Sequence, residues 1–527
     1  MDIGLISIIL LCGMLFLLAI GMPLGFASGF LAAVVMFLKF GPELLLRDFG
    51  TGPLNILAQR MYGLTTDYVL ISVPLFIFMA CLLERSGIAR DMYTSLNAWM
   101  SRTRGGIALV TAVMAIVMAA MSGIIGGEVV LLGLIALPQM LRLGYDQNLA
   151  IGTICASGSL GTMIPPSIVL IFYGLITETS INALFKAAFL PGFVLAGCYM
   201  LYIVVRTRLH PEQAPLPEPT GDEIPFGTKC VLLVALVAMT ALGLTLAYLA
   251  VELAQFALDQ LFPPTEADAV RATVSWVVLA PYLAVPAVLL AVIGWPRVRT
   301  AWAMGKGLVA PLLVVGVVLG SIYGGIAAIT EAAAMGTVAV IVLIVVRREF
   351  TLELFREALM RTFKSTGTII WVTFGATALA GAYSISGGPT YVANLIVGAE
   401  LPTMGILLVM MVIFLFLGAF MDWVGIVLLV MPVFLPIILK LPIEEIGLFG
   451  TLEARHVGVW FGILFCVNMQ VSFLSPPFGP AAFYLKSVAP AHITLPDIFR
   501  GFLPFIGLQL FVLALVLCFP LITTVFL

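Results

Sequence analysis

Charged residues are scarce in this chain. Lys, Arg, Asp and Glu together make up 10% of its 527 residues, whereas hydrophobic residues make up 62%. A soluble globular protein carries about 25% charged residues. The composition, with a mean hydropathy of +1.17, therefore excludes that class and indicates a polytopic membrane protein in a lipid bilayer. No run of basic residues resembles a nucleic-acid-binding surface, so we expect no nucleic acid partner.

Motifs for metal binding, thiol redox chemistry and ATP hydrolysis are missing as well. The 7 Cys residues form no C-x-x-C pair, and the 3 His residues have no metal-ligand spacing, so we expect no cofactor. The sequence has no GxxxxGK[ST] loop, which argues against an ATP-driven pump with its motor in this chain. No Lys or Arg precedes the first apolar run, and this predicts a retained membrane helix instead of a signal peptide.

Long apolar runs separated by short polar stretches fill the chain. Residues 230–251 and 274–292 predict two membrane spans with basic outer edges, which are expected to be cytoplasmic. The loop expected between these two spans is acidic and contains Glu252, Asp259, Glu266 and Asp268. We divide the chain into a first repeat (residues 1–208), a linker with two extra membrane helices (209–305) and a second repeat (306–527).

The two repeats show the same order of segments. Each contains an amphipathic stretch that predicts an interfacial arm, at residues 89–104 and 349–364. A hydrophobic run broken by Gly and other small or polar residues follows, and then a run broken by two consecutive Pro residues. Self-similarity of this kind indicates two structural repeats. The sequence does not say whether the repeats are inverted relative to each other.

The breaks in the hydrophobic runs indicate what the protein does. They lie at residues 122–128 and 157–167 in the first half, and at residues 418–425 and 468–479 in the second. Non-helical backbone at membrane depth is tolerated only against protein or a water-filled cavity. Broken segments at matching places in two halves point to the binding site of a transporter.

Oxygen-bearing side chains gather at these breaks. Asp422 and Glu128 lie inside hydrophobic runs, where a charged residue costs about 2.5–3.5 kcal/mol. Such groups mark an ion or substrate path, or else each lies solvated near a hairpin tip. Hydroxyl groups and freed carbonyls at both breaks predict a site for a hard cation. The alternative is helix packing by small residues. The hydroxyls are those of Ser122, Ser157, Ser159, Ser472 and Ser475.

The paired prolines predict a second kind of site. Half-helices that start after Pro165-Pro166 and Pro476-Pro477 would direct their positive N-terminal ends at the breaks. Such ends bind anions, for example a carboxylate. The alternative for each pair is a kink without a binding role.

These motifs resemble the large membrane subunit, the DctM-type permease, of tripartite ATP-independent periplasmic (TRAP) transporters. The resemblance covers most of the chain. The matching segments are ISVPLFIF from Ile71, RSGI from Arg85, SG at Ser122, Pro138, GY at Gly144, GSLGTMIPPS from Gly158, YG at Tyr173, YGG at Tyr323, TEAAA from Thr330, GAFMD from Gly418 and SPPFG from Ser475. The extra length at residues 209–302 resembles a longer branch associated with mannitol, chloroaromatic and 2-oxo acid uptake. The chain departs from the family at Ile124, Ile125 and Glu128, where small or hydroxyl residues are common.

The resemblance implies a fold and a mechanism. The fold would be all-α and polytopic, with two structural repeats, re-entrant helical hairpins and broken helices, arranged as an elevator-type transport domain and scaffold. The activity would be sodium-coupled import of an organic acid across the bacterial inner membrane, with a periplasmic solute-binding protein and a small four-helix membrane subunit as partners.

The resemblance also assigns roles to residues. The hairpin tips would correspond to residues 157–167 and 472–479. The residues implied for sodium are Ser122, Gly123, Ser157, Gly161, Asp422, Ser472, Ser475 and Gly479. Those implied for the acid are Glu128, Pro165, Pro166, Ser167, Pro476 and Pro477.

Three alternatives stay open from the residues. An ion-coupled carrier or antiporter of the same superfamily would work without a binding protein. An intramembrane enzyme would need paired catalytic residues, but Asp422 has no evident Asp partner in a span and no His lies within one. A structural membrane scaffold would not need two sets of broken helices.

Overall fold

The protein is built of helices. The computed structural model describes residues 2–41, 52–100, 103–123, 126–216, 224–261, 276–398, 401–450 and 452–527. All regular elements in these ranges are helical, and 7 helices are long and apolar enough to cross a membrane. The prediction of an all-α polytopic membrane protein is confirmed.

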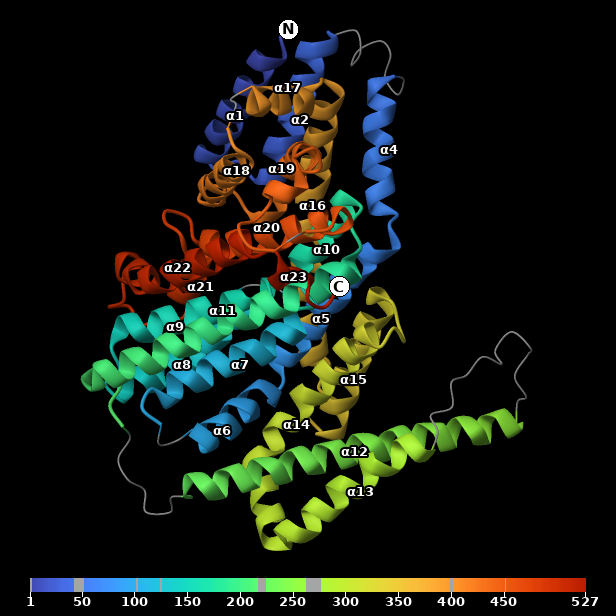
Figure 1. The fold of residues 1–527 in the computed structure, drawn as a ribbon, viewed down its shortest axis with the longest axis vertical. Helices are drawn as coiled ribbons and strands as arrows, with labels where there is room; N and C mark the ends of the chain where they lie inside the picture. The colour runs from blue at the N-terminus through green and yellow to red at the C-terminus, as the bar shows by residue number, and fades with distance from the viewer. Residues whose placement is uncertain are drawn as a thin grey trace. The chain divides into compact units, whose positions relative to one another are not determined.

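Figure 1 labels the helices and colours them by residue number. They are α1 (Ile3–Ala19), α2 (Leu24–Phe40), α4 (Pro53–Thr65), η1 (Tyr68–Ile71), α5 (Ser72–Arg85), α6 (Ile88–Met100), α7 (Gly106–Ser122), α8 (Gly127–Arg142), α9 (Gln147–Ser159), η2 (Leu160–Thr162), α10 (Ile168–Thr177), α11 (Ile181–Leu209), η3 (Pro211–Gln213), α12 (Phe226–Leu261), α13 (Trp276–Ile293), α14 (Trp295–Tyr323), α15 (Ile329–Val346), α16 (Leu352–Ile385), α17 (Gly388–Val397), α18 (Thr403–Gly418), α19 (Trp423–Ile438), η5 (Ile443–Glu445), η6 (Ala454–His456), α20 (Val457–Leu474), α21 (Pro480–Lys486), α22 (Leu495–Cys518) and α23 (Leu521–Thr524).

Polar side chains define where several helices begin. The side chains of Asp146, Ser180 and Thr351 precede α9, α11 and α16, and each accepts a hydrogen bond from a backbone N–H three residues later. These contacts satisfy backbone donors that have no partner within the helix, which matters most where water is scarce. The helix starts in this apolar chain are thus set by isolated polar residues.

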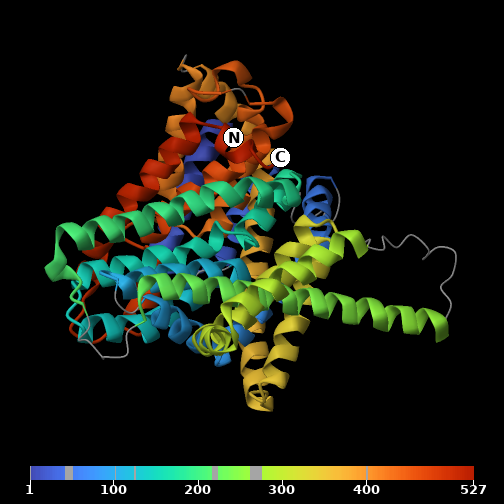
Figure 2. The ribbon, with the colours of Figure 1, turned by 60° about the horizontal axis from the view of Figure 1, so that its bottom comes forward.

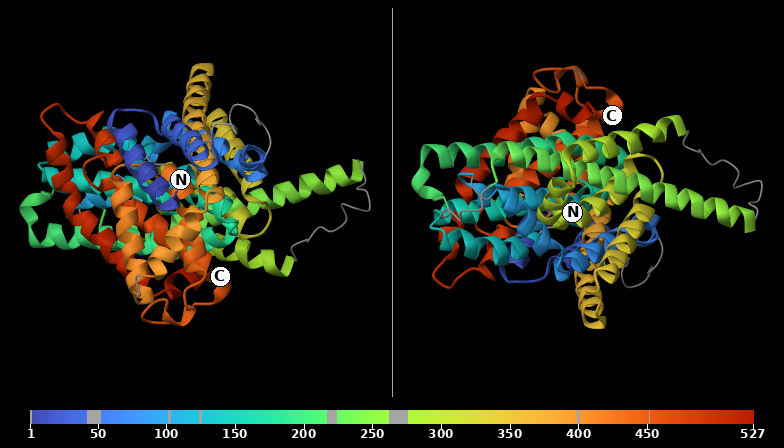
Figure 3. Two further views of the ribbon diagram at one scale, coloured as in Figure 1. Left: turned by 90° about the horizontal axis from the view of Figure 1, so that it is seen from above. Right: turned by 90° about the horizontal axis from the view of Figure 1, so that it is seen from below.

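The chain divides into two compact units, and the first comprises Met1–Ala89, Arg102–Leu216 and Pro311–Leu527. In this unit α2 packs along α16, as the blue and yellow-orange helices in Figure 3 show. A Cβ on Gly375 would lie 2.1 Å from the carbonyl oxygen of Gly25, so the two backbones approach as closely as small residues allow. The interfacial arm expected at residues 349–364 is not separate, because α16 continues as one helix of 34 residues through Ile385.

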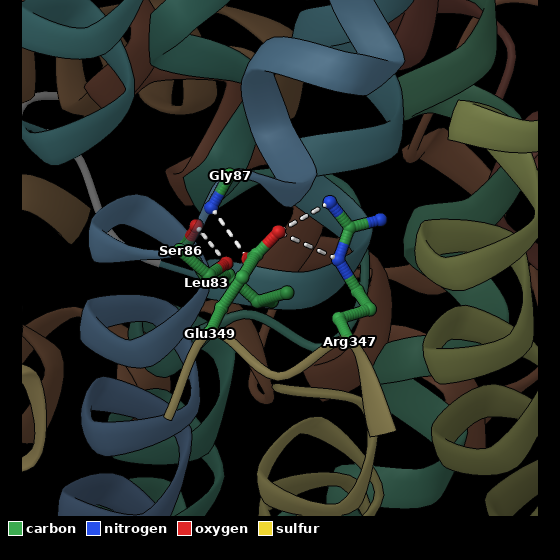
Figure 4. A network of polar contacts seen from close by, with 5 residues as sticks. All are labelled: Leu83, Ser86, Gly87, Arg347 and Glu349. Carbon is green, nitrogen blue, oxygen red and sulfur yellow. Dashed lines mark hydrogen bonds and ion pairs between the residues drawn. The ribbon is translucent and has the colours of Figure 1, made fainter. Parts of the chain in front are cut away.

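A polar network joins the end of α5 to the segment between α15 and α16 (Figure 4). The Glu349 carboxylate accepts hydrogen bonds from the Arg347 guanidinium at 2.7 and 3.1 Å and from the Gly87 backbone N–H at 3.1 Å. The hydroxyl of Ser86 donates to the Leu83 carbonyl at 2.9 Å, which satisfies one carbonyl at the end of α5. The charges in this region therefore fix where one helix ends and another begins.

The second unit comprises Arg90–Ser101 and Pro217–Ala310. It contains α13 and the long α12, which is the green helix in Figure 2. Within it the Lys229 ammonium donates to the Trp99 carbonyl at 2.9 Å. The acidic loop expected between two extra spans is shorter than predicted, because Glu252 and Asp259 belong to α12, whose 36 residues end at Leu261. Glu266 and Asp268 lie outside the described residues.

Candidate functional site

The first break in the chain is the turn of a helical hairpin. Helix α7 ends at Ser122, Gly123 follows with φ 64°, and α8 begins after Gly126 with φ 109°. The Tyr145 side chain, just beyond α8, hydrogen-bonds the backbone of Ile107 at the start of α7. The far ends of α7 and α8 therefore meet, so the two helices run antiparallel. Ile124 and Ile125, where the chain departs from the family pattern, lie outside the described residues.

The second break interrupts a helix that then continues. Helix α9 passes through η2 into a non-helical segment with a cis Pro165-Pro166 peptide bond, after which α10 begins. Ser167 starts α10: its hydroxyl accepts from the Leu170 N–H at 3.4 Å and donates to the Thr162 carbonyl at 2.5 Å. The backbone N–H of Ile168, the first residue of α10, donates to the carbonyl of Gly123 in the hairpin turn at 3.2 Å.

The second half repeats this plan. Helices α18 and α19 form a hairpin whose turn spans residues 419–422, and Thr403 at its start hydrogen-bonds Glu445 beyond its end. Helix α20 then leads through a cis Pro476-Pro477 bond into the short α21. The resemblance had assigned the hairpin tips to residues 157–167 and 472–479. The structure instead places the hairpin turns between α7 and α8 and between α18 and α19, and it places the proline pairs in the interrupted helices that follow.

The two interrupted helices run alongside each other in opposite directions. Three hydrogen bonds join them among the described residues. The Cys155 thiol of the first helix donates to the Ala481 carbonyl of the second at 3.7 Å. The Gln470 amide donates to the Thr162 hydroxyl at 2.5 Å. The Tyr173 hydroxyl donates to the Gly458 carbonyl at 2.7 Å. As residue numbers rise along one helix they fall along the other, so the two repeats are inverted here, and Thr162, directly before the first break, contacts Gln470 inside α20.

Each interrupted helix also crosses to the hairpin of the other half. Helix α10 packs against α19, where the rings of Phe172 and Trp423 lie 5.7 Å apart. Helix α21 packs against α8 and α9, and Figure 1 shows it in red beside these teal helices. Each hairpin therefore contacts interrupted-helix segments of both halves.

Each hairpin turn also rests on the break of its own half. A Cβ on Gly123 would lie 2.3 Å from the carbonyl oxygen of Pro166, so only glycine fits there. A Cβ on Gly418 would lie 1.9 Å from the Ser472 hydroxyl oxygen. The rings of Phe420 and Phe478 lie 6.3 Å apart across the same second junction. We call the contact of residues 122–128 with 163–168 the first junction, and that of residues 418–422 with 472–479 the second junction.

Oxygen atoms without hydrogen-bond donors collect at these junctions. Within the described chain, the backbone carbonyl oxygens of residues 163–166 accept no hydrogen bond from another backbone group. Side-chain oxygens of Glu128, Ser157 and Gln470 are buried and also lack a partner there. Buried polar groups are normally paired, and oxygen-only surroundings suit a hard cation such as sodium. The donor set at the first junction therefore fits a cation.

The two junctions differ in exposure. Pro165, Pro166 and Ser167 are buried, whereas Pro476 and Pro477 are exposed. Asp422 is exposed as well, and it precedes α19 at the positive end of that helix. No ion pair to Asp422 is present among the described residues. The second junction thus presents a carboxylate at the surface of its unit.

The structure brings together most of the residues implied for the site. The first junction holds Ser122, Gly123, Glu128, Pro165, Pro166 and Ser167, and the second holds Asp422, Ser472, Ser475, Pro476, Pro477 and Gly479. Ser157 lies in α9 ahead of the break, and Gly161 lies in η2. Their roles in binding remain predictions. The sequence reasoning missed Thr162 and Gln470, although a polar Gln inside an apolar run was a usable signal.

Comparison with known proteins gives a consistent picture. The sequence profile described as "Tripartite ATP-independent periplasmic transporter, DctM component" matches residues 11–522. The chain is 26% identical over 475 residues to the C4-dicarboxylate TRAP transporter large permease protein DctM of Pseudomonas aeruginosa, covering 90% of this chain and 89% of that one. It is 24% identical over 512 residues to the sialic acid TRAP transporter large permease protein SiaM of Vibrio cholerae, covering 96% and 95%. It is 24% identical over 510 residues to the isethionate TRAP transporter permease protein DctMQ of Oleidesulfovibrio alaskensis, covering 97% of this chain and 64% of that one.

Proposed function

This chain belongs to the family of the DctM component of tripartite ATP-independent periplasmic transporters, and from that premise we propose that it imports an organic acid with sodium as the coupling ion. It is a multi-pass membrane protein, and we place it in the bacterial inner membrane. Its family is one of transporter permeases, not enzymes. A periplasmic binding protein would deliver the acid, and a small four-helix membrane subunit would complete the complex.

The contact between the two interrupted helices beside the first break carries this proposal. Two interrupted helices that run antiparallel and touch through Thr162 and Gln470 form one centre shared by both halves. Inverted repeats with discontinuous helices are the architecture in which secondary transporters alternate access to a site near the bilayer midplane. We propose that the hairpins and interrupted helices move together as a transport domain in an elevator mechanism.

Sodium fits the oxygen atoms of the first junction. The free carbonyls of residues 163–166 and the hydroxyl of Ser122 would replace part of the hydration shell of the ion. At the second junction, the exposed Asp422 and the carbonyls of residues 475–478 are the corresponding candidates. The coupling ions would then be held at both ends of the shared centre.

The start of α10 fits the carboxylate of the solute. This helix has 10 residues, and its N-terminal end faces the break behind the capping side chain of Ser167. Backbone N–H groups and the helix dipole favour a negative charge at such an end. The relatives compared above are named for C4-dicarboxylates, sialic acid and isethionate, all of which are organic acids. That range supports an organic acid as the solute of this chain without selecting one.

The partners follow from the same relatives. The isethionate relative carries its DctM and DctQ names in one permease protein, and this chain spans 64% of its length. We propose a DctQ-type small membrane subunit as a partner of the present protein. The alternative function is an ion-coupled carrier or antiporter that needs no binding protein.

Reconstitution with omitted components tests the proposal and its alternative. Proteoliposomes that contain this chain and the small subunit should take up labelled acid only when the binding protein is added outside. Candidate acids are first ranked by their binding to that purified binding protein. Uptake that is equally fast without the binding protein would refute the proposal in favour of the carrier.

A further inference from the structure

Glu128 stands apart from the other charged residues of the protein. Among the described residues it is the only Asp, Glu, Lys or Arg that is buried, with 1% of its surface exposed. It lies in the first turn of α8, directly after the turn of the first hairpin. An isolated carboxylate in an apolar interior is costly unless a partner compensates its charge. The position therefore needs an explanation that helix packing does not supply.

Only one of the two carboxylate oxygens of Glu128 has a hydrogen-bond partner among the described residues. One oxygen, Oε1, accepts a hydrogen bond from the hydroxyl of Ser122 at the end of α7. The other oxygen, Oε2, is buried and has no partner among the described residues. The N-terminal end of the 16-residue α8 favours the negative charge but does not neutralise it.

No ion pair to Glu128 is present among the described residues. The positive charges of neighbouring elements have other partners: Lys486 of α21 donates to the Ile493 carbonyl at 2.6 Å, and Arg85 of α5 pairs with Glu357. Helix α7 contains no charged residue, and neither does α9. Helix α5 brings Glu84, whose carboxylate lies against Gly127 and is paired with Arg361 of α16 at 2.8 Å. Helix α21 brings the ring of Tyr484 against the hairpin turn. The Glu84 charge is thus compensated by an arginine, while that of Glu128 is not.

We propose that Glu128 is a positioning residue for the cation of the first junction, a role that rests on the sodium coupling proposed above. A serine hydroxyl has one donor and two acceptor lone pairs. When Glu128 takes the donor of Ser122, both lone pairs of that oxygen are left for the ion. The buried carboxylate also supplies the negative charge that balances the cation. This role deepens the proposed function and replaces a direct contact between Glu128 and the acid.

Sodium-dependent thermal stability tests this role without a transport assay. The purified protein is melted at increasing sodium chloride, with choline chloride holding the ionic strength constant. An ion that binds only the folded state stabilises it by RT ln(1 + c/Kd), where c is the sodium concentration, so the rise of the melting temperature with sodium gives the apparent Kd for the ion. The variant Glu128→Gln keeps the size of the side chain and an acceptor for Ser122 but removes the charge. It should raise the apparent Kd for sodium, obtained from the sodium dependence of the melting temperature, about tenfold, as expected for the loss of a charge-assisted contact.

The matched control is Glu331→Gln. Glu331 lies in the first turn of α15 and accepts a hydrogen bond from the Tyr68 hydroxyl at 3.0 Å, but it is exposed. This variant should leave the sodium titration unchanged. In choline alone, Glu128→Gln should melt at or above the temperature of the unaltered protein, because the uncompensated buried charge is gone. A purely structural role would lower that melting temperature and leave the sodium titration as it was, which would overturn the proposal.

A second variant shows whether Glu128 acts through Ser122. Ser122→Ala removes the hydroxyl and leaves the carboxylate in place, and it should weaken the sodium response as well. If Glu128 and Ser122 act as one unit, the double variant should bind sodium as tightly as whichever single variant binds it more weakly. The positioning role would be overturned if the fold-increase in the apparent Kd for sodium in the double variant equalled the product of the two single-variant increases. A sodium response identical in Glu128→Gln and in the unaltered protein would overturn this inference alone, whereas no sodium response in the unaltered protein would overturn the proposed coupling with it.

Discussion

The side-chain amide of Gln470 donates a hydrogen bond of 2.5 Å to the hydroxyl of Thr162, 308 residues earlier in the chain. Both residues are buried, at 0% and 2% exposure. This contact links the interrupted helix of one repeat to that of the other beside the first break. Under the proposed function, an ion bound by one half would influence a solute bound by the other through this contact.

Replacing Gln470 with Leu should uncouple the two halves. The Thr162 hydroxyl would lose its donor, and an unsatisfied buried group costs about 1–3 kcal/mol. We expect a lower melting temperature together with a weaker sodium dependence of acid uptake.

The matched control for that change is Gln509→Leu. Gln509 is also buried and donates to the Tyr199 hydroxyl at 2.8 Å, in a contact between α22 and α11 away from the breaks. It should lower the melting temperature to a similar extent without changing the sodium dependence. Equal effects of both variants on sodium dependence would contradict the role of the Thr162 contact.

Alanine at Gly123 should be far more damaging than alanine at Gly418. At Gly123 the new Cβ meets backbone, the Pro166 carbonyl, and the φ of 64° adds a left-handed cost of about 1–2 kcal/mol. At Gly418 it meets the Ser472 side chain, which a second change to Ser472→Gly would remove. We therefore expect Ser472→Gly to restore the melting temperature that Gly418→Ala lowers.

The control for both glycines is Gly197→Ala, because nothing lies within 4 Å of a Cβ at that position in α11. This change should be neutral or stabilising by up to about 1 kcal/mol. A Gly123→Ala protein with normal uptake would show that the hairpin turn does not rest on the proline break.

Asp422→Ala and Ser157→Ala should each weaken the sodium dependence of uptake with normal membrane insertion. Both remove an oxygen that we assign to the coupling ions. Glu453→Gln serves as the control, because this residue is exposed and paired only with the exposed Arg455 at 2.6 Å. Sodium titrations of uptake that coincide for both variants and the unaltered protein would remove the two residues from the ion sites.

The network around Glu349 should contribute to stability rather than to transport. Its pairing with Arg347 is partly buried, at 31% and 25% side-chain exposure, and it also holds the Gly87 N–H. Glu349→Gln should therefore lower the melting temperature, at a cost of about 1–2 kcal/mol. Glu357→Gln breaks a pair with Arg85 that is 45% exposed on both sides, and it should cost about 0–1 kcal/mol. A larger drop for Glu357→Gln would contradict this ranking.

The positions of the breaks could be predicted from sequence because their cause is local. Gly, Ser and paired Pro residues inside apolar runs disfavour a continuous helix wherever they occur. The duplication of these signals also gave the two repeats. The sequence does not predict whether a break is a hairpin turn or an interruption of one helix, because both contain the same kinds of local residues. Only a distant contact, such as that of Tyr145 with Ile107, distinguishes them.

Other features depend on contacts between residues far apart in the sequence, which a local pattern does not predict. The inversion of the repeats follows from contacts such as Tyr173 with Gly458, which are 285 residues apart. The continuity of α16 is not predicted from sequence, because its charged first half and apolar second half have the patterns of two separate elements. The chain there has no helix-breaking proline, so one helix forms and the change in polarity alone does not end it. Glu128 was recognised as unusual, but its bond to Ser122 needed the hairpin to be folded.

Solute-dependent entry of radioactive sodium into proteoliposomes tests the central claim most directly. The vesicles contain this chain with the small subunit, and the loaded binding protein is supplied outside. If the two interrupted helices bind sodium and acid together, adding the acid should accelerate sodium entry, and the Gln470→Leu variant should lose that acceleration. Sodium entry that is the same with and without the acid would contradict the account.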